Sequence, residues 1–215
     1  MEKNLKSKRR KIFTPSYFKV FCKLYELTFM SKNEPNENKK SIIKLLQSAI
    51  KMLEECQEFG KLIPEVGSNM VYARQDANTL EDVAGLTGRI IKVKNQAIAV
   101  GEIEFGWAKY MGSVILTALT IDKEKRVAIS LRNDKKIVSA CKSLGLELIE
   151  FVDKAPESYV KEKCVTPFAL LTLKEVPDGI YDHGDIGIEP LIILFGVEPV
   201  NLAQTVCKVA KALVD

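Results

Sequence analysis

A nearly continuous apolar run close to the C-terminus is the feature that most constrains the fold. Residues 189–195 read EPLIILF, and an extended segment with apolar side chains on both faces is expected to be buried in a sheet. Residues 198–213 repeat apolar side chains at helical spacing from Val200 to Ala210, which predicts an amphipathic helix. This combination, together with the other elements below, is typical of an α/β or α+β domain with one central sheet.

Helix and strand patterns alternate through the middle of the chain. Ser41 is a good N-cap for a helix predicted over 41–59, and Gly60 is expected to end it. A hairpin predicted over 89–103 indicates that the sheet is at least partly antiparallel. The remaining predicted elements are strands at 70–72, 126–131 and 146–151 and helices at 79–84, 106–120 and 134–144.

The chain has 215 residues, which suits one domain or one domain with an appendage. We expect a basic tail over 1–12, an aromatic helical extension with a linker over 13–40, and the main domain over 41–215. The extension has one apolar face, formed by Phe18, Phe21, Tyr25 and Phe29. That face is expected to pack within the core or against a second copy in a homodimer, or to be the remnant of an upstream domain.

Charge is concentrated at the start of the chain. The net charge is +4, and residues 1–12 alone carry +5, which leaves −1 for the rest. A solvated terminus is favoured over a nucleic-acid role for this tail. The sequence has no apolar run of the length that a membrane span needs and no signal-peptide pattern, so we expect a cytoplasmic protein that does not enter a membrane.

Cysteine and histidine usage excludes several classes of site. The five cysteines are widely spaced and form no C-x-x-C pair, which is typical of reduced, mostly buried thiols. The single histidine, His183, excludes His-cluster metal sites and HExxH chemistry. The chain also lacks a dinucleotide-binding G-x-G-x-x-G, a Walker A loop and a nucleophile elbow, which removes the commonest nucleotide-binding and hydrolase classes.

Two glycine-containing segments offer polar groups to a ligand. In residues 62–69 a Pro and Gly67 form a turn, and Ser68 and Asn69 follow where the chain enters a strand. In residues 85–89 the glycines allow close approach to the backbone, and Arg89 suits a phosphate or carboxylate. The alternatives are a plain helix-to-strand connection and a surface arginine after a turn.

Two further segments have a similar character. Gly106 and Lys109 lie where a helix is expected to begin, which suits an anion, although a capped helix with Trp107 in the core is the alternative. Residues 181–190 place two aspartates, a glutamate and His183 on one loop. Its carboxylates are candidate Mg²⁺ ligands and His183 is a candidate acid or base, against the alternative of an acidic turn.

The order and the amino-acid sequences of these segments resemble those of the ThiN family of thiamine-phosphate synthases. The resemblance runs from about Leu62 to the C-terminus and rests on LIPEVGSN at 62–69, DVAGLTGRI at 82–90 and YDHGDIGIEPLI at 181–192. It implies a three-layer α/β/α sandwich on a mixed, mostly antiparallel sheet, similar to class II aldolase domains. It also implies that hydroxymethylpyrimidine diphosphate and hydroxyethylthiazole phosphate are joined to give thiamine phosphate and diphosphate.

The chain departs from the family pattern at several positions. Tyr110 stands where the family has a histidine, Ser130 replaces an asparagine although Arg132 is kept, and Ile188 replaces a lysine. The stretch around 164–168 is also unlike the family's. These departures support a second hypothesis, a non-catalytic module that senses thiamine phosphate, as ThiN-like domains do in transcriptional regulators.

The resemblance and the chemical demands of the reaction assign roles to individual residues. Arg89 and Lys109 are expected to bind phosphate, with Tyr110 at the catalytic position. Asp185 and Glu189 are expected to position Mg²⁺ or the pyrimidine amine, and Glu65 to support its loop. The complete set of expected substrate-binding residues is Glu65, Gly67, Ser68, Asn69, Gly88, Gly106, Arg132, Asp182, His183, Gly184, Asp185, Gly187 and Glu189.

Overall fold

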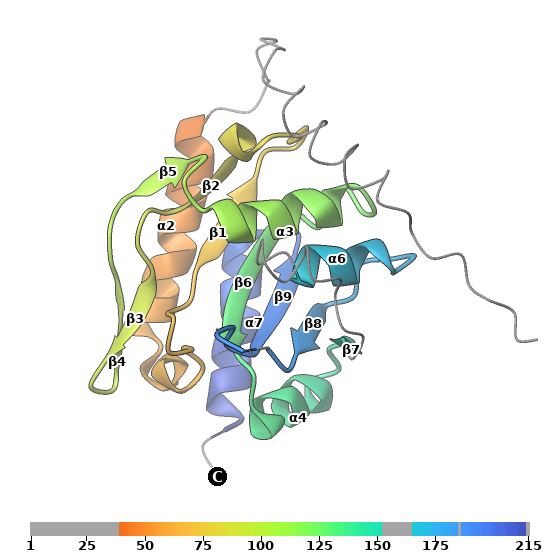
Figure 1. Cartoon of the computed structure of the whole chain (residues 1–215). Helices are drawn as coiled ribbons and strands as arrows, with labels where there is room; N and C mark the ends of the chain where they lie inside the picture. The colour runs from red at the N-terminus through yellow and green to blue at the C-terminus, as the bar shows by residue number, and fades with distance from the viewer. Residues whose placement is uncertain (1–38, 152–164, 185, 214–215) are drawn as a thin grey trace, which may run out of the picture. The chain divides into compact units, whose positions relative to one another are not determined.

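A seven-stranded mixed sheet forms the centre of the computed structural model (Figure 1). The structure describes residues 39–151, 165–184 and 186–213. The predicted basic tail, nearly all of the predicted extension and Asp185 therefore lie outside the described residues. Within the described ranges, every helix is too short or too polar to cross a membrane.

The strands follow the order β5-β2-β1-β6-β9-β8-β7 across the sheet. Each neighbouring pair is antiparallel except β7 and β8, which run parallel. The mixed, mostly antiparallel sheet is thereby confirmed. The strands are β1 (Met70–Ala73), β2 (Val83–Leu86), β5 (Ile103–Phe105), β6 (Val127–Arg132), β7 (Leu148–Phe151), β8 (Gly179–Asp182) and β9 (Leu191–Gly196).

The apolar run near the C-terminus forms β9, between β6 and β8. Ile192 and Leu194 belong to the hydrophobic cluster on one face of the sheet, and Ile193 and Phe195 belong to the cluster on the other. A strand that contributes to two cores needs apolar side chains at successive positions. The predicted burial of this strand is confirmed.

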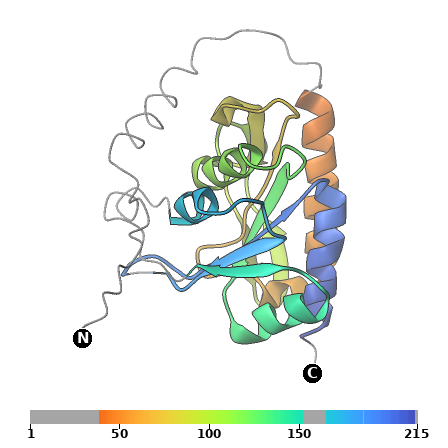
Figure 2. The same cartoon turned by 90° about the vertical axis from the view of Figure 1, so that its right-hand side faces the viewer.

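Helices cover both faces of the sheet, which gives three layers (Figure 2). Helices α2 (Lys39–Glu55) and α7 (Pro199–Lys211) lie side by side on one face. On the other face lie α3 (Lys109–Leu119) and the short α6 (Val165–Leu171). Helix α4 (Lys135–Ser143) buries Ile137, Ala140 and Cys141 in the same cluster as α2 and α7.

The predicted hairpin exists, but it is not part of the main sheet. Strands β3 (Ile90–Val93) and β4 (Gln96–Ala99) pair with each other and with no other strand. The second half of the predicted hairpin is therefore wrong as a single element, because it is divided between β4 and β5. Gly101 adopts a φ of +89°, a left-handed conformation that turns the chain before β5. Strand β5 then pairs with β2 at the edge of the main sheet.

Local boundaries also differ from the prediction. Ser41 is the third residue of α2 and not its N-cap, and α2 ends at Glu55, before a separate 3₁₀ helix over Gln57–Lys61. The predicted helix over 79–84 is a 3₁₀ turn, Leu80–Asp82, which leads directly into β2. The sequence patterns missed β2, β8 and α6, each of which has seven residues or fewer.

The described cysteines are free thiols, and two of them, Cys56 and Cys141, are buried. Burial raises the pKa of the Cys141 thiol to about 11, because a thiolate loses solvation in the core. We expect Cys141 to be alkylated by iodoacetamide about a hundredfold more slowly at pH 7.5 than an exposed cysteine, because the thiolate is the reactive form. Its rate should still rise about tenfold per pH unit between pH 7.5 and 9.

Peptide mass spectrometry after timed alkylation of the folded protein measures this rate. The same protein in denaturant is the control, because unfolding returns the Cys141 thiol to its ordinary pKa. A Cys141 rate in the folded protein equal to that in denaturant would contradict the burial of this thiol.

Candidate functional site

The polar segments that the sequence analysis selected meet at one end of the sheet. Residues 62–69 lead into the start of β1, residues 86–89 follow β2, Arg132 ends β6, and residues 182–190 join β8 to β9. Because β1 is antiparallel to both β2 and β6, the start of β1 lies beside their ends. Four segments that are far apart in the sequence therefore form one surface.

Glu189 holds two of these segments together. Its Oε1 accepts a hydrogen bond from the backbone N–H of Glu65 at 2.8 Å, and its Oε2 accepts one from Val66 at 2.9 Å. The turn that it holds includes Gly67, whose φ of +79° favours glycine. Both carboxylate oxygens are thus used to fix the loop, which makes Glu189 a positioning residue in this structure.

The side chain of Asn69 is buried and does not face solvent. Its Nδ2 donates to the carbonyl of Leu86 at 3.1 Å, and its Oδ1 accepts from the Leu86 N–H at 3.3 Å. The Asn69 backbone N–H donates to Oγ of Ser130 at 3.0 Å. The amide therefore fixes the end of β2, three residues before Arg89. From the sequence, this side chain was expected to bind substrate instead.

Ser68 is also fully buried, and its Oγ has no hydrogen-bond partner among the described residues. Its backbone forms an antiparallel bridge with Ile90, with an N–H to carbonyl distance of 2.9 Å in one direction and 2.8 Å in the other. This bridge ties the first segment to the second. In the structure Ser68, like Asn69, positions Arg89.

Arg89 is exposed, and its guanidinium has no ion-pair or hydrogen-bond partner within the described parts of the chain. Its backbone is fixed on both sides. A Cβ added to Gly67 would lie 2.9 Å from Cβ of Arg89, and one added to Gly88 would lie 2.3 Å from the carbonyl oxygen of Val100. An exposed guanidinium on a fixed backbone, without a partner among the described residues, is suited to bind a phosphate or carboxylate.

The loop over 182–190 is held by its own polar groups. The carboxylate of Asp182 accepts from the Gly184 N–H at 2.8 Å, and burial raises the pKa of Asp182, an effect that N–H groups of Gly184 and Leu191 partly offset. Gly184 has a φ of +66°, and an added Cβ would clash with the carbonyl of Ile188. Gly187 lies in the same loop with a φ of +75°.

His183 is exposed at the edge of this loop and is paired. Its Nε2 lies 2.6 Å from Oε1 of Glu150, at the end of β7. This hydrogen bond lowers the pKa of Glu150. Arg132, also at this end of the sheet, has a loose ion pair with Asp134 at 3.9 Å between Nη2 and Oδ2.

The residues at the start of α3 divide into two groups. The hydroxyl of Tyr110 lies 2.8 Å from Oγ1 of Thr166 on α6, so it belongs to a contact between two helices. Lys109 is exposed, and Gly106 lies against the carboxylate of Glu81. Trp107 is 58% exposed, which excludes the alternative that placed it in the core.

The described residues show no group of three histidine, cysteine, aspartate or glutamate side chains arranged as a metal site. Glu189 uses both oxygens for backbone N–H groups, and the other expected ligand is outside the described residues. The described residues by themselves therefore do not complete a protein-held Mg²⁺ site. The expected Mg²⁺ site at Asp185 and Glu189 stays a prediction.

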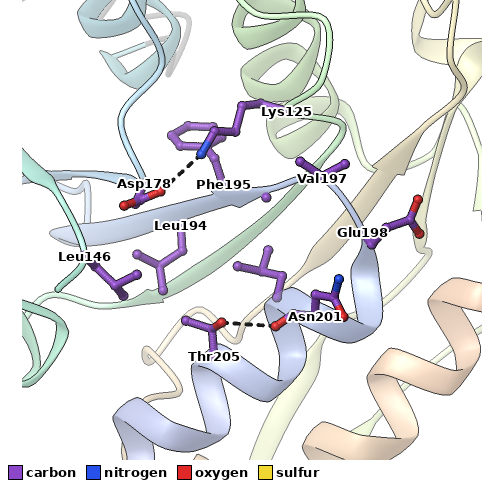
Figure 3. Close-up of a pocket in the computed structure, with 11 residues that line it drawn as sticks. Lys125, Leu146, Asp178, Leu194, Phe195, Val197, Glu198, Asn201 and Thr205 are labelled. Atoms are coloured by element: carbon purple, nitrogen blue, oxygen red, sulfur yellow. Dashed lines mark hydrogen bonds and ion pairs between the residues drawn. The ribbon is translucent and has the colours of Figure 1, made fainter. Parts of the chain in front are cut away.

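A cavity of about 230 Å³ lies at the opposite end of the sheet, where β9 leads into α7 (Figure 3). Several of its polar groups are already engaged within the protein. The Nζ of Lys125 lies 3.1 Å from the carboxylate of Asp178, and Oγ1 of Thr205 donates to the carbonyl of Asn201 at 3.1 Å. None of the predicted site residues lines this cavity, so it does not compete with Arg89 as the candidate site.

Three residues near the candidate site were not predicted to take part in it. Thr166 was missed because α6 is a seven-residue helix with no clear pattern, and Glu150 because its partner His183 is 33 residues away. Trp107 was considered only as a core residue. Its position directly after Gly106, at the start of a helix, is the signal that could have identified it.

The fold and the site define a three-layer α/β domain in which glycine-containing loops present an exposed arginine that is unpaired within the described residues. The comparisons identify the family. A family model described as thiamine-phosphate synthase ThiN matches residues 45–208. The chain belongs to the ThiN family.

Individual relatives agree with this assignment. Thiamine-phosphate synthase ThiN of Methanothermobacter thermautotrophicus is 31% identical over 175 residues, which cover 79% of this chain and 92% of that protein. The bifunctional thiamine biosynthesis protein ThiDN of Methanocaldococcus jannaschii is 33% identical over 171 residues, which cover 79% of this chain but 40% of that longer protein.

Solved structures show the same fold. The crystal structure of the C-terminal domain of phosphomethylpyrimidine kinase gives a TM-score of 0.69 at 31% identity, covering 82% of this chain and 100% of that one. A second crystal structure, also of a C-terminal domain, gives a TM-score of 0.73 at 33% identity, covering 81% of this chain and 96% of that one. Both comparisons confirm the fold that the resemblance implied.

The buried amide of Asn69 provides a direct test of how the site is built. Asn69→Asp replaces the Nδ2 donor with an acceptor facing the Leu86 carbonyl, and we expect it to lower the free energy of unfolding by roughly 2–4 kcal/mol. Urea unfolding followed by circular dichroism measures this change. Asn95→Asp, in the exposed turn between β3 and β4, is the matched control and should change stability by less than about 0.5 kcal/mol. Equal stability of both variants and the parent would contradict this role.

Proposed function

We propose that this chain is a thiamine-phosphate synthase, which joins hydroxymethylpyrimidine diphosphate to hydroxyethylthiazole phosphate. One observation carries the proposal: the exposed guanidinium of Arg89, which has no partner among the described residues, is carried on a backbone that Gly67, Ser68 and Asn69 fix. Membership of a family described as thiamine-phosphate synthase supports a role in thiamine biosynthesis.

The proposed reaction needs positive charge more than it needs a nucleophile. The bond between the pyrimidine methylene carbon and the diphosphate oxygen breaks, and its electron pair leaves with diphosphate. The lone pair of the thiazole nitrogen forms the new bond to that carbon. Negative charge therefore grows on the leaving group, where a guanidinium carried on a fixed backbone stabilises the transition state. Arg89 is the residue that we assign to this task.

The other cations at the site have smaller assigned roles. Lys109 is exposed at the first turn of α3, where it can bind the phosphate of the second substrate. Arg132 is partly neutralised by Asp134, so we assign it to orientation of the substrate. Asn69 and Glu189 keep the loops in place without contact with the reacting atoms. Any Mg²⁺ would supply further charge neutralisation at the diphosphate.

A second candidate function is the binding of thiamine phosphate without turnover. The observation that favours it is the 2.8 Å contact between the Tyr110 hydroxyl and Thr166. The resemblance implies a histidine at this position, and Tyr110 instead links α3 to α6. A module that retains Arg89 and the loops around it, but lacks a histidine at position 110, is suited to bind thiamine phosphate without forming it.

Substitution of Arg89 tests the site that both functions share. We expect Arg89→Ala to lower kcat/KM and the affinity for thiamine phosphate by roughly 10- to 100-fold, because a charge-assisted hydrogen bond to phosphate is lost. Arg89→Lys should recover part of the loss, since it keeps the charge but not the planar fork. Thiamine phosphate formation over time and calorimetric titration are the two measurements.

The matched control for Arg89 is Lys123→Ala, which removes an exposed cation beyond the opposite end of the sheet. Lys123→Ala should leave kcat/KM and the affinity for thiamine phosphate within about twofold of the parent values. Retention of full affinity by folded Arg89→Ala would exclude Arg89 as the phosphate-binding residue.

Substitution of Tyr110 distinguishes the two candidate functions. For a synthase, Tyr110→His should raise kcat, on the order of tenfold, because it supplies an imidazole that can exchange protons near neutral pH. Tyr110→Phe is the control, since it removes the contact with Thr166 without adding an imidazole. No product from the parent and from Tyr110→His, with thiamine phosphate still bound, would support the sensing module.

A further inference from the structure

Trp107 has an unusual environment for a tryptophan. It is the only tryptophan in the chain, and 58% of it is exposed, although tryptophan is usually well buried. Its position is nevertheless fixed, because Nε1 donates a hydrogen bond to the carbonyl of Thr87 at 2.7 Å. One bond at the edge of the indole restrains the ring while leaving much of its surface open to solvent.

The restrained indole lies close to Arg89. Thr87, which accepts the indole hydrogen bond, is two residues before Arg89, so their Cα atoms are at most about 7.6 Å apart. Val100 donates its backbone N–H to the Arg89 carbonyl at 2.9 Å and is 44% exposed. Val66, 51% exposed, precedes the glycine that packs against Cβ of Arg89.

Three exposed apolar residues are therefore linked to the segment that carries Arg89, whose guanidinium is unpaired within the described residues. Exposure of these apolar surfaces to water is unfavourable, and covering the indole and the two valines with a ligand lowers the free energy. A ligand that has a phosphate at one end and a flat ring at the other would satisfy all of them. The guanidinium would bind the phosphate, and the indole would cover the ring.

We propose that Trp107 is the stacking platform of this site and that it selects a phosphorylated aromatic heterocycle whose ring carries positive charge. The inference rests on the proposed function and adds the part of the ligand that the indole contacts. Formation of the carbon–nitrogen bond turns the thiazole into a cationic ring, and tryptophan is the side chain whose face attracts cations most strongly. The indole therefore binds the product ring more tightly than the neutral thiazole of the substrate.

The fluorescence of the single tryptophan reports directly on this contact. The full-length chain is titrated with thiamine phosphate, with hydroxyethylthiazole phosphate and with inorganic phosphate, while emission is recorded. We expect strong quenching by thiamine phosphate, weaker quenching by the neutral thiazole phosphate, and none by inorganic phosphate. Inorganic phosphate should still compete with thiamine phosphate, because both bind Arg89.

Calorimetry on variants separates stacking from phosphate binding. Trp107→Leu should lower the affinity for thiamine phosphate about two- to tenfold and leave the affinity for inorganic phosphate unchanged. Trp107→Phe should keep most of the affinity for thiamine phosphate. Val197→Ala, which truncates another exposed apolar side chain at the opposite end of the sheet, is the matched control and should change neither affinity.

Each other outcome overturns the proposal in a recognisable way. If thiamine phosphate binds without quenching, and if the parent and Trp107→Leu bind it with equal affinity, Trp107 is not part of the site. The proposed function is then unaffected. An emission spectrum that changes with protein concentration and not with ligand shows that a second copy of the chain covers the indole. Absence of both binding and turnover in the parent excludes the proposed function together with this inference.

Discussion

The buried amide of Asn69 is the interaction on which the candidate site depends. It binds both backbone groups of Leu86, and the Asn69 N–H donates to Ser130, so one residue connects β1 with β2 and β6. A buried amide is costly unless it is hydrogen-bonded, and here the amide and the strand ends satisfy each other. The backbone that leads to Arg89 can therefore adopt essentially one arrangement.

The site separates residues that position the backbone from residues that meet solvent. Glu189, Ser68 and Asn69 are engaged with main-chain groups, and Asp182 closes its own loop through the Gly184 N–H. Arg89 and Trp107 are among the side chains that this scaffold leaves exposed to solvent. A rigid scaffold with a few exposed groups loses little conformational entropy when a ligand binds, which is the physical basis of preorganisation.

Local patterns predicted the long elements and missed the short ones. Strand β9 was found because its apolar run is nearly continuous, and helix α7 because apolar residues repeat at helical spacing over thirteen residues. Strands β2 and β8 have four residues each, and β8 begins at Gly179, so neither shows a period. The hairpin was found, but its separation from the main sheet depends on the turn at Gly101 and on the pairing of β5 with β2.

The sequence by itself determined which chemical groups the protein can offer: one arginine in a glycine-containing segment, a proline–glycine turn, an acidic loop and the order of the motifs. Only the tertiary structure decided which of these groups a ligand can reach. Ser68 and Asn69, expected at the substrate, are buried, and Trp107, considered as core, is exposed. The reason is physical: burial and pairing here depend on contacts between residues 17 to 124 positions apart, beyond the range of a local pattern.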